Sequence, residues 1–249
     1  MGFADKTVWI IGASDGIGAA LARAMARDGA RLILSARNRT ALTALAEECG
    51  TAEVLPLDLA KKGSLAAAVN GIGQGTLDAV ICTAALYDPG QVAELDPEAT
   101  ATLITVNLFG SFEVARLTPP LLRDGGLLVL FGSVAGYFGL PGGQPYSATK
   151  AAVNNLAETL RVELAPRVDV RLVCPGFVQT RLTAKNRFSM PAIITPDQAA
   201  AMVMRGLQGS AFELHFPRRF TVWIKLLRAL PYALSLRLTA RLRVRQADR

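Results

Sequence analysis

Short apolar runs alternate along the chain with longer stretches in which apolar residues recur every three or four positions. The short runs predict strands and the recurring pattern predicts helices, because each period places the apolar side chains on one face of its element. Strands are expected at 7–11, 31–35, 52–57, 77–82, 126–131 and 168–173. Helices are expected at 17–28, 40–49, 64–71, 97–117 and 146–165, with one more opening at the capping box Thr195-Pro196-Asp197-Gln198.

The predicted strands are mostly apolar throughout and do not alternate between apolar and polar residues. Such strands are typical of a parallel sheet that is covered by helices on both faces. We therefore predict a doubly wound, mostly parallel α/β fold of the Rossmann-like type. No linker interrupts the pattern before about residue 210, so one domain is expected over 1–210, followed by a helical extension over 211–249.

A glycine-rich turn lies between the first predicted strand and the first predicted helix. Gly12, Gly16 and Gly18 let the backbone turn sharply and approach a pyrophosphate closely, and the helix that follows presents free N–H groups to it. A strand-to-helix turn also recruits glycine for backbone freedom alone. Its position at the first junction of an alternating chain favours a dinucleotide site, formed by Gly12, Ser14, Asp15, Gly16, Ile17 and Gly18.

The end of the second strand indicates which dinucleotide binds. A site for NAD usually carries an acidic residue there to hold the ribose hydroxyls, but no acid occurs between Asp28 and Glu47. Arg37, Asn38 and Arg39 stand there instead, and a guanidinium can hold a 2′-phosphate with two hydrogen bonds. The alternative is that these arginines are solvated loop charges. NADP is therefore favoured over NAD as the cofactor, with Arg37 and Asn38 beside its phosphate.

A serine, a tyrosine and a lysine form the candidate catalytic group. Ser133 follows the fifth strand, and Tyr146 and Lys150 stand one helical turn apart, so their side chains should project together. Reduction of a carbonyl needs a proton for the developing alkoxide, which a tyrosine of ordinary pKa supplies poorly at neutral pH. We expect the ammonium of Lys150 to lower the pKa of Tyr146, and Ser133 to donate a hydrogen bond to the substrate oxygen.

Over about residues 4–210 the chain resembles the short-chain dehydrogenase/reductase family. The likeness rests on the glycine turn, on Ser133 with Tyr146-x3-Lys150, and on the segment Pro175-Gly176-Phe177-Val178-x-Thr180, all in the family's order and spacing. The resemblance implies that Tyr146 is the general acid/base and that Ser133 polarises the carbonyl. It also implies that Lys150 lowers the tyrosine pKa and holds the nicotinamide ribose.

The same resemblance assigns further residues. It implies that Asn107 retains a water for proton relay, although a kinking or packing role is the alternative, and that Asp58 and Leu59 lie beside the adenine. The loop that orients the nicotinamide would be formed by Pro175, Gly176, Val178 and Thr180. The resemblance makes 1–210 the dinucleotide-binding and catalytic domain and implies a homodimer or homotetramer.

One segment departs from the family pattern. The family usually has Asn-Asn-Ala-Gly after the fourth strand, whereas this chain has Cys82-Thr83-Ala84-Ala85. The asparagine that ties neighbouring strands together is missing, and Thr83 is expected to supply part of its hydrogen bonding. Thr83, Ala84 and Ala85 are still expected to line the cofactor, with the methyl group of Ala85 narrowing the approach.

The composition narrows the range of functions. Cys49, Cys82 and Cys174 stand far apart and His215 is the single histidine, so neither a metal site nor a Ser-His-Asp triad is expected. The first residues lack the pattern of a secretion signal, and no run of about 18 uncharged apolar residues occurs. We therefore expect a cytoplasmic protein, with contact to a membrane surface left open by the tail.

The net charge of +7 is concentrated in that tail. Residues 216–249 hold nine Lys or Arg and one acid, Asp248, whereas the other 215 residues hold 18 basic and 19 acidic side chains. An apolar stripe lies beside the basic residues before Pro231 and is formed by Trp223, Leu226, Leu227 and Leu230. Beyond Pro231 an apolar row and a basic row follow, formed by Leu234, Leu238 and Leu242 and by Arg237, Arg241 and Arg245.

The stripe has three interpretations. Packing on the protein's own body or on a second subunit is favoured, a helix lying in a membrane interface is the main alternative, and a nucleic acid is the least favoured partner. The position of the tail also suggests that it covers the active-site cleft and helps to select substrates.

The segment 181–195 is apolar with scattered positive charge, which suggests a lipophilic, anionic carbonyl or alcohol substrate. The residues concerned are Arg181, Lys185, Arg187, Met190, Ile193 and Ile194. Carrier-bound 3-oxoacyl chains, steroid-like molecules and small aldehydes all stay open. The alternative function is a nucleotide-binding regulatory or scaffold protein without turnover, against which the presence of Ser133, Tyr146, Lys150 and Asn107 argues.

Overall fold

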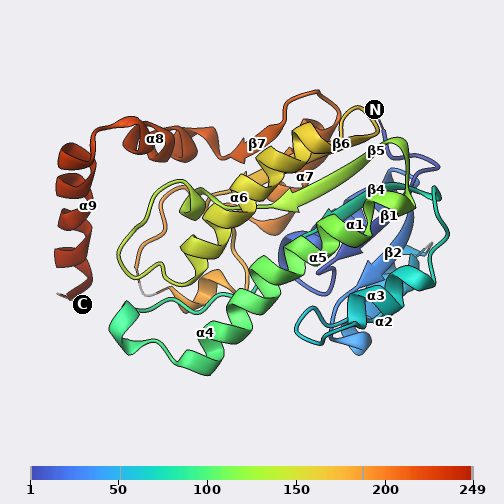
Figure 1. The fold of residues 1–249 in the computed structure, drawn as a ribbon, viewed down its shortest axis with the longest axis horizontal. Coiled ribbons are helices and arrows are strands. Elements are labelled where there is room, and N and C mark those ends of the chain that lie inside the picture. Colours follow the sequence, from blue (N-terminus) through green and yellow to red (C-terminus); the bar gives the residue numbers. More distant parts are fainter. Residues whose placement is uncertain (1, 51, 187, 248–249) are drawn as a thin grey trace.

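The computed structural model describes residues 2–50, 52–186 and 188–247, with side chains as far as residue 240. Its centre is a seven-stranded sheet in the order β3-β2-β1-β4-β5-β6-β7, in which every neighbouring pair is parallel (Figure 1). The strands are β1 (Thr7–Ile11), β2 (Arg31–Ser35), β3 (Ala52–Val54), β4 (Leu77–Cys82), β5 (Leu122–Phe131), β6 (Val168–Pro175) and β7 (Glu213–Phe216). The predicted doubly wound α/β fold is confirmed.

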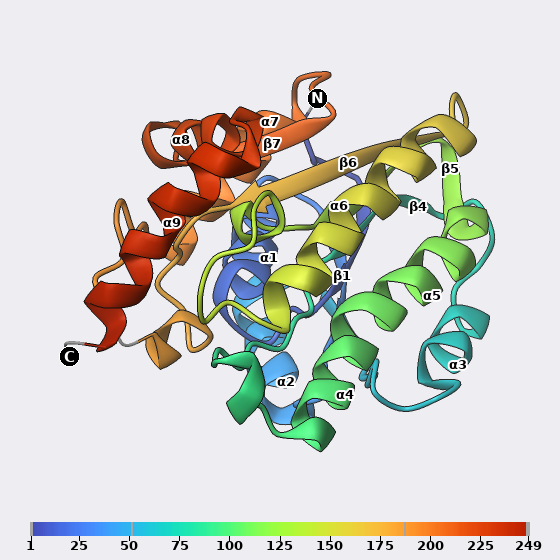
Figure 2. The same ribbon diagram turned by 60° about the vertical axis from the view of Figure 1, so that its left-hand side comes forward.

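Helices cover both faces of the sheet, and each face has its own apolar core. On one face α1 (Gly16–Arg27), α2 (Arg39–Cys49) and α7 (Pro196–Leu207) pack over residues such as Ile10 and Val129. On the other, α3 (Ser64–Asn70), α5 (Gly110–Leu117) and α6 (Tyr146–Glu163) pack over Trp9 and Leu128. In Figures 1 and 2, α4 (Pro97–Ile104) continues into α5 beside α6. Short helical turns occur at Val92–Glu94, Pro119–Leu121, Val134–Gly136 and Thr183–Lys185.

Three predicted elements differ from the structure for local reasons. β3 ends at Val54, although the backbone N–H groups of Leu55 and Leu57 still donate to the carbonyl oxygens of Leu34 and Ala36 on the β2 side. β5 begins at Leu122, because an irregular register lets Leu122 pair with Leu77 before the regular pairing resumes at Leu127 with Ala79. The helix expected over 97–117 is interrupted by a wide π turn at Thr105–Phe109.

The capping box that opens α7 is confirmed. The hydroxyl of Thr195 accepts a hydrogen bond from the backbone N–H of Gln198 (3.2 Å), and the amide oxygen of Gln198 accepts one from the backbone N–H of Thr195 (3.0 Å). Two N–H groups without a partner inside the helix are thereby satisfied. The capping box therefore fixes the residue at which the preceding loop ends and α7 begins.

The tail begins inside the sheet. β7 pairs with β6 and is its edge strand, so the sheet extends beyond the division expected at residue 210. This strand was not expected from the sequence. Two helices follow, α8 (Arg218–Ala229) and α9 (Tyr232–Ala247), which lie beyond the β7 edge (red in Figure 1). No helix in the described part is long and apolar enough to span a bilayer.

The junction between β1 and β4 carries the hydrogen bonds expected of Thr83. Its hydroxyl lies 3.2 Å from the carbonyl oxygen of Ile11 and 3.1 Å from that of Gly12, and its backbone N–H donates to Ile11 at 2.8 Å. The threonine thus ties the ends of two neighbouring strands, as the asparagine does in the family pattern.

Replacement of that hydroxyl by a methyl group tests the tie. We expect Thr83→Val to lower the free energy of unfolding by about 1–2 kcal/mol, because the two half-buried carbonyls lose a donor. Thr83→Ser, which keeps the hydroxyl, should lose less than half as much. Urea unfolding followed by circular dichroism measures both variants, and equal losses for Val and Ser would contradict the role of the hydrogen bond.

Candidate active site

A large cavity of about 1610 Å³ opens where the carboxyl ends of the central strands meet. It spans the point between β1 and β4 at which the strand order reverses, which is where ligands bind in open α/β sheets. Every residue expected at the cofactor or the reacting atoms lines this cavity, with the exception of Asn107. The lining residues are Gly12, Ser14, Asp15, Gly16, Ile17, Gly18, Arg37, Asn38, Asp58, Leu59, Thr83, Ala84, Ala85, Ser133, Tyr146, Lys150, Pro175, Gly176, Val178 and Thr180.

The glycine turn forms a close-fitting cradle at one end of the cavity. Gly12 has φ of +97°, and a Cβ placed on it would lie 2.5 Å from the backbone nitrogen of Ala84. A Cβ on Gly18 would overlap the carbonyl oxygen of Gly12. α1 begins at Gly16, so its free N–H groups face the cavity. This cradle fits the pyrophosphate of a dinucleotide, which needs close backbone approach and unpaired donors.

A guanidinium group, that of Arg37, lies at the other end of the cradle, after β2. Arg37 is exposed and lines the cavity, whereas Arg39 is the first residue of α2 and does not line it. The side chain of Asn38 accepts a hydrogen bond from the backbone N–H of Ala41 (3.1 Å) and so caps α2. Of the two residues expected at a 2′-phosphate, Arg37 and Asn38, Arg37 is therefore the one that offers a charged group at the cavity.

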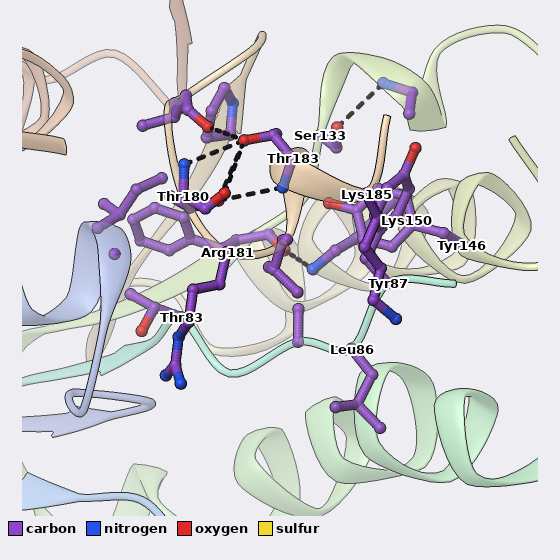
Figure 3. A pocket seen from close by; sticks show the side chains of 18 of the residues that line it. Thr83, Leu86, Tyr87, Ser133, Tyr146, Lys150, Thr180, Arg181, Thr183 and Lys185 are labelled. Atoms are coloured by element: carbon purple, nitrogen blue, oxygen red, sulfur yellow. Dashed lines mark hydrogen bonds between the residues drawn. The ribbon is translucent and has the colours of Figure 1, made fainter. Parts of the chain in front are cut away.

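Ser133, Tyr146 and Lys150 converge on the opposite wall. Tyr146 is the first residue of α6, and the Nζ of Lys150 lies 5.6 Å from the centre of its ring (Figure 3). That Nζ donates a hydrogen bond to the carbonyl oxygen of Phe131 (2.6 Å), at the end of β5. Ser133 caps the turn Val134–Gly136, its Oγ accepting from the backbone N–H of Ala135 (3.1 Å). The side-by-side projection of Tyr146 and Lys150 is confirmed.

Burial dominates the electrostatics of this group. Burial raises the pKa of Tyr146 to about 12, and the hydrogen bond from Ser133 opposes this only in part. Burial also lowers the pKa of Lys150 to about 8. The net shift of the Tyr146 pKa is therefore upward, because desolvation is its largest cause, and the Nζ of Lys150 is directed at a backbone carbonyl. That Lys150 lowers the tyrosine pKa stays a prediction.

Asn107 lies in the π turn and is fully buried. Its Oδ1 accepts from the backbone N–H of Leu86 (2.7 Å), and its Nδ2 donates to the carbonyl oxygen of Leu86 (2.9 Å) and to Thr149 Oγ1 (3.3 Å). The side chain thus holds the segment after β4 against α6, next to Tyr146. The water-retaining role that the family likeness implies stays a prediction.

The segment after β6 closes over the cavity. Arg181 forms an ion pair with Asp15 of the glycine turn, Lys185 pairs with Asp88 (3.1 Å), and Asn186 accepts a hydrogen bond from the hydroxyl of Tyr87 (2.6 Å). The positive charges of Arg181 and Lys185 are therefore each paired with a carboxylate in this structure, and the anionic character expected of the substrate stays a prediction. Arg187 lies outside the described residues.

Two groups of lining residues were not expected. The ring of Tyr87 lies edge-on to that of Tyr146, with centres 4.9 Å apart (Figure 3), although nothing in the sequence marks a tyrosine five residues beyond a strand as part of a site. From α8, Phe220, Ile224 and Leu227 line the cavity. Their spacing of four and three residues does mark one helical face, which bears out the suggestion that the tail covers the cleft.

A half-buried carboxylate, that of Glu213, secures α8. The side chain of Glu213 on β7 is bonded by the hydroxyl of Tyr137, from the segment after Ser133, and by the Nζ of Lys225 on α8. Burial opposes ionisation, but the bonds from Lys225 and Tyr137 hold the pKa of Glu213 below its usual value. Glu213 thus connects the tail to the segment that follows Ser133. Among the described residues no cluster of His, Cys, Asp and Glu could hold a metal ion.

Known proteins share this arrangement. A family model described as short chain dehydrogenase matches residues 6–190. An uncharacterized oxidoreductase from Myxococcus xanthus is 32% identical over 236 residues, which cover 91% of this chain and 93% of that protein. A short chain dehydrogenase from Burkholderia cenocepacia, solved in complex with NADP, has a TM-score of 0.83 and 28% identity, covering 96% and 99% of the two chains.

A further solved structure shares the fold but was determined with the other dinucleotide. It is a short chain dehydrogenase/reductase from Burkholderia phymatum in complex with NAD, with a TM-score of 0.82, 20% identity, and coverage of 92% and 95%. Solved structures of this fold thus include complexes with either dinucleotide.

The burial of the Lys150 ammonium leads to a prediction about the free energy of unfolding and its dependence on pH. Its pKa is lowered on folding to about 8, so below pH 8 the cost of burying the charge is fully present. Between about pH 8 and the usual lysine pKa the folded protein releases this proton and the unfolded chain keeps it, so stability rises with pH through that window. We expect Lys150→Met to be more stable than the wild type at pH 7, by up to about 3 kcal/mol, and the difference to vanish near pH 10.5.

Urea unfolding at pH 7 and near pH 10.5 measures this difference. The exposed Lys61, replaced by Met, is the matched control and should change stability by less than about 0.5 kcal/mol at either pH. A Lys150→Met protein that is equally or less stable at pH 7 would show that the bond to Phe131 outweighs the desolvation cost.

Proposed function

The chain belongs to the short-chain dehydrogenase/reductase family of oxidoreductases, and from this premise we propose that it transfers hydride between NADP(H) and a carbonyl or secondary alcohol, with Tyr146 as the general acid/base. The convergence of Ser133, Tyr146 and Lys150 on the cavity that holds the glycine cradle carries the proposal. The dinucleotide supplies or accepts the hydride. Every other part of the step falls to side chains of the protein.

In the reductive direction Tyr146 donates its phenolic proton to the carbonyl oxygen as charge develops there. With its pKa near 12, the phenol keeps this proton throughout the neutral range. Ser133 polarises the same oxygen by a hydrogen bond, and Lys150 stabilises the phenolate that remains. The ammonium of Lys150, with its pKa near 8, is present at neutral pH and lost above it.

The preference for NADP rests on Arg37. It is the exposed guanidinium at the cavity end of β2, where no carboxylate is available for a ribose hydroxyl. The relative from Burkholderia cenocepacia, which was solved with NADP, supports this assignment by likeness. Asp58 and Leu59 line the adjoining wall and would contact the adenine.

The substrate is proposed to be lipophilic. Beyond Tyr146 the cavity is walled by apolar side chains from four separate segments, which are Leu86, Leu140, Phe177, Phe188, Ile224 and Leu227. The charges at its rim are already paired, by Asp15 with Arg181 and by Asp88 with Lys185. A neutral carbonyl on an apolar skeleton meets these walls best, because a charged group placed against them would lose water and gain no partner.

We propose that the protein assembles as a homodimer or homotetramer. Large apolar side chains stand exposed along α4, α5 and the turn between them, namely Ile104 (41% exposed), Phe109 (57%) and Phe112 (49%). A contiguous apolar face on a globular protein is a common basis for association with a second copy. This face lies on the helices that border the cavity, so assembly would also support the site.

Removal of the phenolic hydroxyl tests the catalytic role. We expect Tyr146→Phe to lower kcat for NADPH-dependent reduction of an apolar ketone by about 10²–10⁴-fold, because the proton donor is lost. NADPH binding, followed by fluorescence titration, should change less than about threefold. The exposed Tyr232, replaced by Phe, is the control. Wild-type protein that binds NADPH but reduces nothing in a broad carbonyl panel would favour the regulatory or scaffold function.

Arg37 offers a separate test of cofactor choice. We expect Arg37→Ala to weaken NADPH binding by about 10–100-fold, as the loss of a charge-assisted hydrogen bond predicts, and to leave NADH binding nearly unchanged. Arg39→Ala, one turn away from the cavity lining, should affect neither. An equal effect of Arg37→Ala on both dinucleotides would remove the basis for the NADP preference.

A further inference from the structure

α8 has an apolar inner face and an apolar outer face. The inner face, Phe220, Ile224 and Leu227, lines the cavity. The outer face consists of Val222, Trp223, Leu226 and Leu230, which are 43%, 70%, 51% and 37% exposed. Along this face the stripe through Trp223 does not pack on the protein's own body, so of the favoured interpretation only packing on a second subunit stays open here. Leu227 alone of that stripe lies at the cavity.

Positive charge surrounds the outer face. Arg218, Arg219 and Arg228 are exposed on the same helix, and none of them forms an ion pair within the described part of the chain. Lys225 is the only basic residue of α8 with a carboxylate partner there, Glu213. Residues 216–249 hold nine basic residues and one acid, while the rest of the chain is almost neutral. The side chains of Arg241, Leu242 and Arg245 lie outside the described residues.

We propose that the outer face of α8, with its flanking arginines, docks on an anionic lipid bilayer and places the wall of the active-site cavity against the membrane. Trp223, Leu226 and Leu230 would enter the boundary between headgroups and acyl chains, and Arg218 and Arg219 would meet the lipid phosphates. The inference rests on the proposed function, because it assigns a source to the lipophilic substrate of that same cavity.

The charge distribution distinguishes a bilayer from a second copy of the chain. In a twofold dimer the same face meets itself, so unpaired arginines would oppose one another around the contact. An anionic bilayer instead offers negative charge to the arginines and an apolar interior to Trp223. A nucleic acid would satisfy the arginines but leave the apolar side chains without a partner.

The helix that meets the membrane is held firmly to the site. Lys225, between the two faces of α8, reaches Glu213, which also binds Tyr137 close to Ser133. Docking of the outer face therefore need not displace the inner face from the cavity. A lipophilic carbonyl dissolved in the bilayer would lie one helix diameter from Phe220 and Ile224 and would reach the cavity with little exposure to water.

Vesicle binding with tryptophan fluorescence tests the proposal on the full chain. The protein holds two tryptophans, and Trp9 is fully buried, so a change on docking reports Trp223. With vesicles of phosphatidylcholine that contain about one-third phosphatidylserine, we expect co-flotation and a shift of the emission to shorter wavelength. Vesicles of phosphatidylcholine alone should bind roughly tenfold or more weakly.

Substitutions separate the apolar and ionic contributions. Leu226→Ser with Leu230→Ser should weaken binding to the anionic vesicles roughly tenfold or more, while Trp223 stays as the reporter. Arg218→Gln with Arg219→Gln should do the same and reduce the dependence on salt. Val162→Ser, at an apolar residue of α6 that is 78% exposed, is the matched control and should bind as the wild type does.

Several outcomes would overturn the proposal. These are absence of vesicle binding, binding that is equal for neutral and anionic vesicles, or self-association that the Leu226→Ser and Leu230→Ser changes abolish without any vesicle binding. Binding to single- or double-stranded nucleic acid that ignores those two changes would point to that partner instead. Turnover of a water-soluble ketone is measured in parallel: activity without vesicle binding refutes the docking alone, and vesicle binding without activity refutes the proposed function alone.

Discussion

The structure depends above all on the lack of space between the end of β1 and the end of β4. The backbone at Gly12 approaches Ala84 so closely that a side chain at Gly12 would collide with the main chain. Because the turn is this tight, α1 begins beside the sheet with its N-terminus at the cavity, and Thr83 reaches the carbonyl groups of Ile11 and Gly12. The cradle and the strand tie are two results of one steric constraint.

A second constraint is the burial of charge at the catalytic wall. Lys150 is 3% exposed, and its ammonium meets a backbone carbonyl and no carboxylate of the described residues. Such an arrangement costs stability, and an apolar residue would pack there more favourably. In the proposed mechanism the same ammonium lies beside Tyr146, where it would serve proton transfer. The wall is thus organised for reactivity at some expense to the folded state, as strained and perturbed sites in enzymes often are.

The tail completes the site that the sheet begins. β7 continues the sheet at the β6 edge, and α8 supplies apolar lining that no earlier segment provides. Glu213 joins this late part of the chain to Tyr137 and so to the segment of Ser133. The sequence suggested a boundary near residue 210 between a catalytic domain and an extension. The cavity does not respect this boundary, because residues on both sides of it line the cavity. Substitutions in the tail would therefore affect the selection of substrates before any other property of the site.

Local features of the sequence sufficed for six of the seven strands, the glycine turn, the capping box at Thr195 and the pairing of Tyr146 with Lys150. Each follows from residues a few positions apart, where periodicity and steric rules act directly. The tertiary structure alone decided the rest. Tyr87 meets Tyr146, Arg181 meets Asp15 and α8 meets the cavity across long stretches of chain, and these contacts depend on how distant elements pack. The direction of the Tyr146 pKa shift belongs to the same class, because desolvation is set by everything that surrounds a side chain and by no single neighbour.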